Sequence, residues 1–218
     1  MRTGRVEVDA GVVRLRPLAR SDRESWRDIR LRDEAILRPV EPTLATSWAA
    51  AHSRAEFRRI LRGARRSLRD GAAMIGVIEL DGHFAGQLTL TGFRPFPLLT
   101  CIAGYWVDSA RTGGGVATAA LALGVDHAAA VGMHRVEATV RPDNVASRRV
   151  LAHCGFREEG LMAGAMHMDG AWRDHILAAR LVGEDHVSAV DDLVAAGRAR
   201  LIEEDPDAPD DGIVYGRF

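Results

Sequence analysis

The chain contains no lysine. All 29 of its basic residues are arginine, and 30 acidic residues bring the net charge to −1. The absence of lysine excludes the lysine-containing phosphate loop of many nucleotide-binding proteins. The balanced charge gives no reason to expect nucleic acid or a membrane surface as a partner, so charged recognition must be local to a site.

Cysteine is scarce as well, and long apolar runs are missing. Cys101 and Cys154 lie in apolar surroundings, and no Cys/His spacing in the chain indicates a metal site. We expect both to be reduced thiols. The N-terminal sequence lacks the apolar stretch of a signal peptide, and no segment reaches the roughly 18 apolar residues of a membrane span. The sequence therefore predicts a cytoplasmic protein with no metal and no membrane partner.

Length and composition predict one elaborated domain followed by a tail. The 218 residues are 47% hydrophobic, which is enough for a substantial core. We place the domain at residues 1–182 and the tail at 183–218, where a helix over 187–200 precedes the acidic stretch EEDPDAPDDG. The composition of that stretch predicts disorder.

Hydrophobic periodicity and turn residues give the order of the elements. We expect a strand at 12–18, helices at 21–34 and 49–69, a hairpin at 72–90 and a further strand at 99–108. A helix at 115–131, a strand at 134–140, a short helix after 142–144 and a closing hairpin at 161–181 follow. The arginines of the second helix fit a solvated face or a docking surface. Asp81-Gly82 and Asp169-Gly170 are hairpin turn pairs. This order predicts a mixed α/β fold with a mostly antiparallel central sheet flanked by helices.

Three consecutive glycines, Gly113 to Gly115, lie between an expected strand and an expected helix. A glycine-rich turn at a helix N-terminus leaves backbone N–H groups pointing outward at the positive end of the helix dipole, which makes an anion site. Glycine is needed there because a side chain would block a diphosphate, and because such turns often require positive φ. A tight turn that packs the helix on the strand explains the same residues. This motif alone therefore does not distinguish an anion site from a structural turn.

A dinucleotide-binding fold is the rival interpretation. Gly113 and Gly115 match the first two glycines of GxGxxG, and Glu137 lies near the distance expected for the ribose carboxylate. The third glycine position, however, is Thr118, and the preceding hairpin makes the sheet antiparallel where that fold requires parallel βαβ units. The sequence therefore argues against a nucleotide-dependent oxidoreductase.

A second motif indicates which anion is bound. RPDNVASRRVLAHCGF (141–156), together with GYWVDSARTGGGVATAAL (104–121), resembles the GNAT superfamily of acyl-CoA N-acyltransferases. With GMHRVEATV and DGAWRDH added, the chain resembles the RimJ/RimL-type branch, which acetylates N-terminal amines of ribosomal proteins. The resemblance covers approximately residues 11–182. Its motifs are specific for fold and cofactor rather than for the acceptor.

The resemblance implies a GNAT fold in which the strands at 99–108 and 134–141 splay apart and acyl-CoA lies between them. Backbone N–H groups around Thr112 to Ala117 would bind the coenzyme diphosphate, and the backbone near Val107 would polarise the thioester carbonyl. The coenzyme-binding residues that the resemblance implies are Trp106, Val107, Arg111, Thr112, Gly113, Gly114, Gly115, Val116, Ala117, Thr118, Asn144 and Ser147.

The expected catalytic residues depart from the family pattern. Many GNAT proteins protonate the departing thiolate with a tyrosine where this chain has Leu151, whereas RimL-like proteins use the serine of N-x-x-S, which Ser147 matches. The glutamate that RimL-like proteins use as general base aligns with Met166. Glu137 is the expected substitute base, because strand alternation puts it on the same face as Thr139.

Each of these residues also has a structural interpretation. Ser147 fits a first-turn serine that contacts the backbone, Asn144 fits a helix N-cap, and Glu137 fits an arginine-paired glutamate. Histidine has a suitable pKa for a base, and His134, His167 and His175 are candidates. Because the chain has eight histidines, a surface role is favoured for each of the three. Asp174 matches a recurrent acidic position of the family.

The fraction of an amine that is neutral at pH 7 narrows the class of acceptor. At pH 7 an α-amine is about 10% neutral, whereas a lysine amine is neutral only to about 0.04%. A site without a strong base therefore suits a peptide N-terminus or a small amine. The expected reaction is direct transfer of an acetyl or succinyl group from acetyl-CoA or succinyl-CoA to the amine in a ternary complex, since similar actinobacterial GNAT members use succinyl-CoA.

Two alternatives stay open. The missing tyrosine and glutamate also fit a non-catalytic module that binds acyl-CoA. The closing hairpin and residues 183–218 offer surface that fits a homo-oligomer as well as a self-covering tail.

Overall fold

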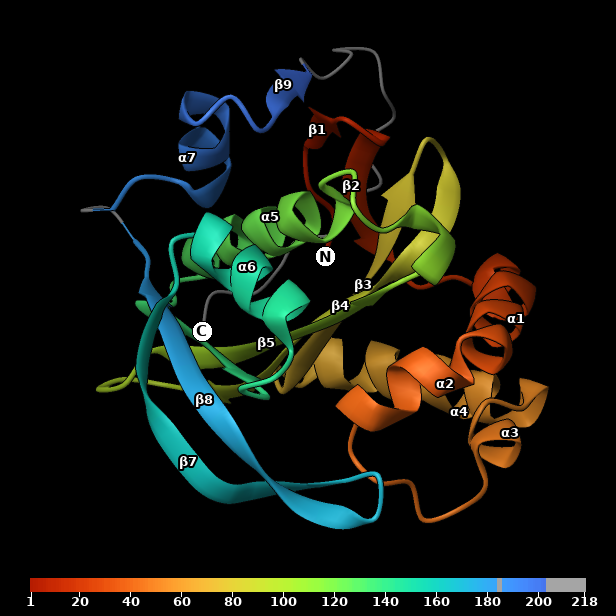
Figure 1. Cartoon of the computed structure of the whole chain (residues 1–218). Coiled ribbons are helices and arrows are strands. Elements are labelled where there is room, and N and C mark those ends of the chain that lie inside the picture. Colours follow the sequence, from red (N-terminus) through yellow and green to blue (C-terminus); the bar gives the residue numbers. More distant parts are fainter. Residues whose placement is uncertain (184–185, 203–218) are drawn as a thin grey trace.

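The computed structural model describes residues 1–183 and 186–202, and the acidic stretch expected to be disordered lies outside them. The described residues form a nine-stranded sheet with the order β7-β8-β6-β5-β4-β3-β2-β1-β9 (Figure 1). The strands are β1 (Arg5–Val8), β2 (Gly11–Pro17), β3 (Ala73–Leu80), β4 (His83–Arg94), β5 (Thr100–Val107), β6 (Arg135–Val140), β7 (Arg157–Met168), β8 (Ala171–Leu181) and β9 (Arg200–Ile202). Neighbouring strands pair antiparallel except β5 and β6, which are parallel. The predicted mixed, mostly antiparallel fold is confirmed.

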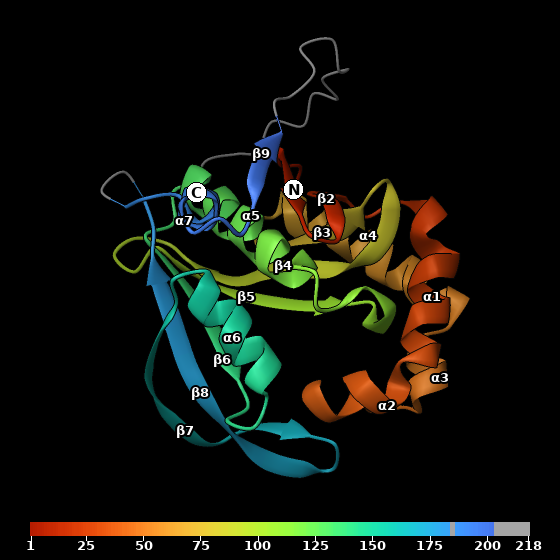
Figure 2. The ribbon, with the colours of Figure 1, turned by 45° about the horizontal axis from the view of Figure 1, so that its top comes forward.

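Helices cover both faces of this sheet (Figure 2). They are α1 (Arg23–Arg32), α2 (Glu34–Leu37), α3 (Trp48–Ala51), α4 (Arg54–Arg69), α5 (Val116–Ala130), α6 (Val145–His153) and α7 (Ala189–Ala195), with 3-10 turns η1 (Arg20–Asp22), η2 (Arg38–Val40) and η3 (Ser109–Arg111). None of the helices in the described ranges has the length and apolarity to cross a membrane.

Alternating residues of β3 divide the buried side chains into two cores. Ile78 packs into the larger core with α5, whereas its neighbour Val77 faces a smaller core with Trp26 of α1 and Phe57 of α4. Because successive strand residues point to opposite faces, α5 and α4 lie on opposite sides of the sheet (Figure 1). α5 is apolar all round, as its Ala- and Leu-rich sequence requires for a helix buried against the sheet and α7.

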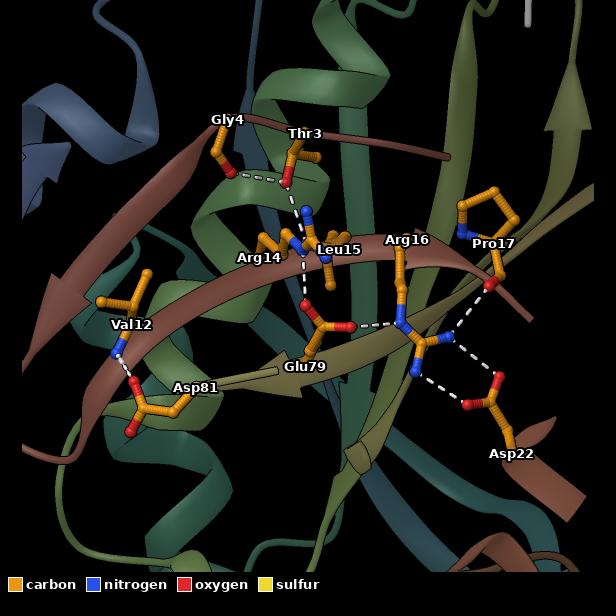
Figure 3. Close-up of polar contacts among 10 residues, drawn as sticks. All are labelled: Thr3, Gly4, Val12, Arg14, Leu15, Arg16, Pro17, Asp22, Glu79 and Asp81. Atoms are coloured by element: carbon orange, nitrogen blue, oxygen red, sulfur yellow. Dashed lines mark hydrogen bonds and ion pairs between the residues drawn. The ribbon is translucent and has the colours of Figure 1, made fainter. Parts of the chain in front are cut away.

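An ion-pair network fixes the start of α1 on the sheet (Figure 3). Arg16 of β2 donates to both carboxylate oxygens of Asp22, at 2.9 and 2.7 Å, and also to Glu79 of β3. Arg14 donates to the other oxygen of Glu79 at 2.5 Å. Asp22 precedes α1, so these bonds set the position of the helix that carries Arg30, a residue discussed below.

Three local predictions were incomplete. The expected helix over 49–69 is two helices, because Ser53 caps α4 and interrupts the run after α3. β1 was not anticipated. The expected helix over 187–200 is the shorter α7 followed by β9, which pairs with β1. Since α7 packs on α5, the described residues after 182 belong to the same packed unit.

Candidate active site

β5 and β6 separate after a short paired segment. They pair only from Thr100 with Arg135 to Ile102 with Glu137. Beyond this point β5 continues beside β4 and β6 continues beside β8. A cavity of about 1030 Å³ lies at this opening and is lined by both strands. The expected splay is confirmed, and it leaves backbone groups of two strands facing one space.

The glycine turn closes one end of the cavity. Gly113 and Gly115 have φ values of 90° and 85°, and Gly115 precedes α5. Gly114 instead packs against the β1–β2 turn, where its carbonyl accepts a 3.1 Å hydrogen bond from the Ala10 N–H. The first intrahelical bond of α5 runs from Ala119 N–H to the Gly115 carbonyl, so the N–H groups of the first turn have no helical acceptor. This donor set, on small residues, fits a diphosphate.

Most of the expected coenzyme residues line this cavity. Those that do are Trp106, Val107, Thr112, Gly113, Gly115, Val116, Ala117, Thr118, Asn144 and Ser147. Gly114 and Arg111 do not, and the Arg111 guanidinium lies 3.7 Å from the Asp108 carboxylate. The sequence interpretation missed several titratable side chains that line the cavity, which are Asp9, Glu41, Arg141, Arg149, His153 and Arg198.

Ser147 lines the cavity and has an unexpected partner. Its Oγ is 2.8 Å from the hydroxyl of Tyr105 on β5. Burial raises the pKa of Tyr105, so its hydroxyl stays protonated at neutral pH and can donate. Asn144 accepts a 3.0 Å bond from the Ser147 N–H, which confirms it as the N-cap of α6. Leu151, at the usual tyrosine position, is buried and apolar.

Glu137 does not reach the cavity. It lies where β5 and β6 are still paired, and its carboxylate accepts bonds from Arg135 at 2.9 Å and Arg94 at 3.1 Å. Thr139, two residues later on the same face, does line the cavity. Strand alternation gave the correct face, but the position along the strand is too close to the paired end. We therefore do not assign Glu137 as the base.

The other half of the cavity is formed by the α2–α3 segment and the β7–β8 hairpin. The side chains lining it there are Leu37, Val40, Glu41, Pro42, Met166, Met168 and His175. Met166 occupies the wall where the resemblance places a glutamate. The Nδ1 of His175 donates to the Arg173 carbonyl at 3.1 Å, and its Nε2 is fully buried without a partner in the described ranges. His134 and His167 do not line the cavity.

Tyr105 and Trp106 project to opposite sides of β5. Tyr105 packs with the larger core near α6, and Trp106 with the smaller core near α1. Gln87 lines the cavity beside Trp106, and its Oε1 accepts the indole N–H groups of Trp26 at 2.9 Å and Trp106 at 3.2 Å. Because both indoles are donors, the carboxamide nitrogen of Gln87 is left to donate elsewhere.

The two cysteines and the potential metal ligands of the described residues are further candidate sources of chemistry. Burial raises the pKa of Cys101 and of Cys154 to about 12, so both stay as thiols. Within residues 1–183 and 186–202, no group of three or more His, Cys, Asp or Glu side chains is arranged to hold a metal ion.

The chain matches a known family. Residues 13–157 match the family model of the acetyltransferase (GNAT) domain. The chain belongs to the GNAT acetyltransferase family. Mycobacterium smegmatis RimJ, solved in complex with CoA-disulfide, is 49% identical to this acetyltransferase, with a TM-score of 0.89 over 93% of this chain and 97% of that one.

Curated relatives agree with this assignment. The [ribosomal protein uS5]-alanine N-acetyltransferase of Escherichia coli is 27% identical over 80% of this GNAT chain and 89% of its own length. The probable N-acetyltransferase YjcK of Bacillus subtilis is 34% identical over 59% of this chain and 72% of its own. The RimJ/RimL-like branch predicted from the motifs is confirmed, and the chain is an acyl-CoA-dependent N-acetyltransferase.

Proposed function

We propose that this acetyltransferase transfers the acetyl group of acetyl-CoA directly to the α-amine of a protein N-terminus, with both substrates bound at once. The observation that carries the proposal is the single cavity that extends from the glycine turn, between β5 and β6, to the α2–α3 segment and the β7–β8 hairpin. Such a space holds an extended donor and an acceptor end to end. A ribosomal-protein N-terminus is the acceptor class, since the E. coli relative is named for the alanine of uS5.

The donor lies in the half with the glycine turn. The free N–H groups at the start of α5, from Val116 to Thr118, receive the diphosphate, and Arg149 and Arg198 supply positive charge on the same cavity. The backbone of Val107 polarises the thioester carbonyl, because this part of β5 has no partner strand on the β6 side.

Ser147 supplies the proton to the departing thiolate. Ser147 lines the cavity, and Tyr105 can donate to its Oγ as the proton leaves. The amine loses one proton to water as the amide forms, and one proton returns from water to the Tyr105–Ser147 pair, so the reaction balances. Proton transfer of this kind contributes roughly 10²- to 10⁴-fold to the rate. The tyrosine that the α6 position lacks is thus replaced by a tyrosine from β5 that acts through the serine.

An acetyl donor fits this cavity better than a succinyl donor. A succinyl carboxylate requires a free cation near the acyl group. Arg30, behind the cavity wall, is already paired with the Glu41 carboxylate, and Arg141, which lines the cavity, is paired with Asp143. We therefore favour acetyl-CoA.

The test is turnover with peptides that begin with alanine or serine. We expect thiol release and addition of one acetyl group to a free α-amine, and no reaction when the α-amine is blocked. Faster turnover with succinyl-CoA would revise the donor. Tight binding of CoA with no turnover of any peptide or small amine would instead favour the non-catalytic module.

A further inference from the structure

A buried arginine lies behind the acceptor half of the cavity. Arg30 of α1 is 8% exposed, and its guanidinium lies 5.0 Å from the centres of the Trp48 and Trp106 rings. Its Nε donates to His52 Nε2 at 2.9 Å, and His52 Nδ1 donates in turn to the Trp48 carbonyl at 2.7 Å. Burial, followed by the charge of Arg30, lowers the pKa of His52 to about 4, which keeps this nitrogen free to accept. The guanidinium therefore has one orientation.

The Arg30 guanidinium pairs with a carboxylate that lines the cavity. Both terminal nitrogens of Arg30 donate to the two oxygens of Glu41, in a bidentate pair. Glu41 lines the cavity, and its side chain is 20% exposed, in contrast to the buried arginine. A carboxylate has about four lone-pair positions, so two remain for another donor.

The segment that carries Glu41 is also fixed from the other side. Pro42 forms a β-bridge with Met168, and the Thr43 N–H donates to the His167 carbonyl at 2.8 Å. Arg141 donates to the Pro39 carbonyl at 2.8 Å, while its remaining charge is paired with Asp143. Glu41 is therefore held between α1 and the end of β7.

The charge distribution in the cavity singles out this side chain. Of the described side chains that line the cavity, two are acidic, Asp9 and Glu41. Asp9 lies in the β1–β2 turn, which contacts the glycine turn at the donor end. Around Glu41 the wall is made mainly of apolar side chains of the α2–α3 segment and β7. An amine that enters the acceptor half of the cavity therefore has Glu41 as its carboxylate partner.

We propose that Glu41 is the binding group for the α-amine of the acceptor, which it holds through N–H···O bonds beside the thioester. This inference rests on the proposed function and adds the group that recognises the substrate. Arg30 is a positioning residue, because it acts only through the orientation of Glu41. Stability alone does not explain why the Arg30–Glu41 pair leaves a carboxylate exposed to the cavity. Replacing a buried ion pair by apolar side chains of similar volume often leaves a protein equally stable or more stable.

The experiment compares Glu41→Gln with Glu34→Gln, a matched change of a glutamate on α2 that pairs with Arg38 outside the cavity. The probes are CoA, a peptide beginning with alanine, and the same peptide Nα-acetylated. Kinetics with acetyl-CoA give kcat and the KM for peptide, and calorimetry gives Kd for CoA. Calorimetry with CoA-saturated protein gives Kd for both peptides.

We expect Glu41→Gln to raise the KM and the Kd of the free-amine peptide about 10- to 100-fold, as for loss of a charge-assisted bond. The Kd of CoA and of the acetylated peptide should stay within twofold, and Glu34→Gln should match the wild type. Unchanged affinity of the free-amine peptide for Glu41→Gln overturns the inference, as does an equal loss for the acetylated peptide. Absence of turnover in the wild type refutes the proposed function instead.

A second variant guards against failure to fold. Glu41→Gln leaves the buried Arg30 incompletely paired, which can destabilise the protein. Arg30→Met combined with Glu41→Leu removes both charges together. It should fold, bind CoA normally and lose the same preference for the free amine, and retention of that preference overturns the inference as well.

Discussion

Replacing Tyr105 by phenylalanine tests whether the proton for the thiolate passes through Ser147. The change removes one hydroxyl and its 2.8 Å hydrogen bond to Ser147 Oγ. Such a bond contributes about 0.5–1.5 kcal/mol to stability, so a loss of about 1 kcal/mol is expected in urea denaturation. If the same hydrogen-bond energy is lost from the transition state, kcat should fall about tenfold, because a factor of ten corresponds to about 1.4 kcal/mol.

Ser147→Ala removes the donor itself, so kcat should fall by about 10² or more. If Tyr105 acts only through Ser147, the double variant should be no slower than Ser147→Ala alone, which is the signature of coupled residues in a double-mutant cycle. The control is Ser188→Ala, which removes a hydroxyl bonded to Asp126 at 2.7 Å outside the cavity and should leave kcat unchanged. Independent, multiplying effects of Tyr105 and Ser147, with Kd for CoA unchanged, would refute the reasoning.

Two further predictions concern the glycine turn and the pH dependence of stability. Gly113→Ala should cost about 1–2 kcal/mol through its φ of 90° alone, since no atom lies within 4 Å of the added Cβ. In Gly114→Ala the Cβ would lie 2.6 Å from that of Ala10, so the β1–β2 turn must shift, and urea titration should show a larger loss. His52 has a pKa lowered to about 4 by burial and by Arg30, so the unfolded chain binds more protons below about pH 6.5. The free energy of unfolding should be highest above that pH and fall towards pH 4, with a shallower fall in His52→Gln; equal slopes in the two proteins would contradict this.

Local sequence signals located much of the site. The Asp81-Gly82 hairpin, the start of α5 after Gly115 and the Asn144 cap each depend on residues a few positions apart, so their structures agree with the sequence interpretation. The expected helix over 49–69 does not agree with the structure. A serine inside an amphipathic run is compatible either with one continuous helix or with a second helix that begins at that serine.

The chemistry of the site was harder to predict where partners are distant in sequence. Tyr105 and Ser147 are 42 residues apart, and their contact depends on how α6 packs over β5. Alternation along β5 offered one clue, since it puts Tyr105 on the side opposite Trp106. Glu41 gave no signal at all, because it lies outside any periodic element and its partner Arg30 is 11 residues away on α1.

The sequence by itself determined the family, the glycine turn, the strand before it and the helix after it, since these depend on short motifs and on backbone conformation. Tertiary structure alone decided which side chains meet in the cavity. Glu137 faces the correct side of β6 yet lies at its paired end, while Glu41 enters the cavity from a segment with no regular pattern. The physical reason is that a strand or a cap is specified by its neighbours in the chain, whereas a binding site is specified by packing between elements far apart in it.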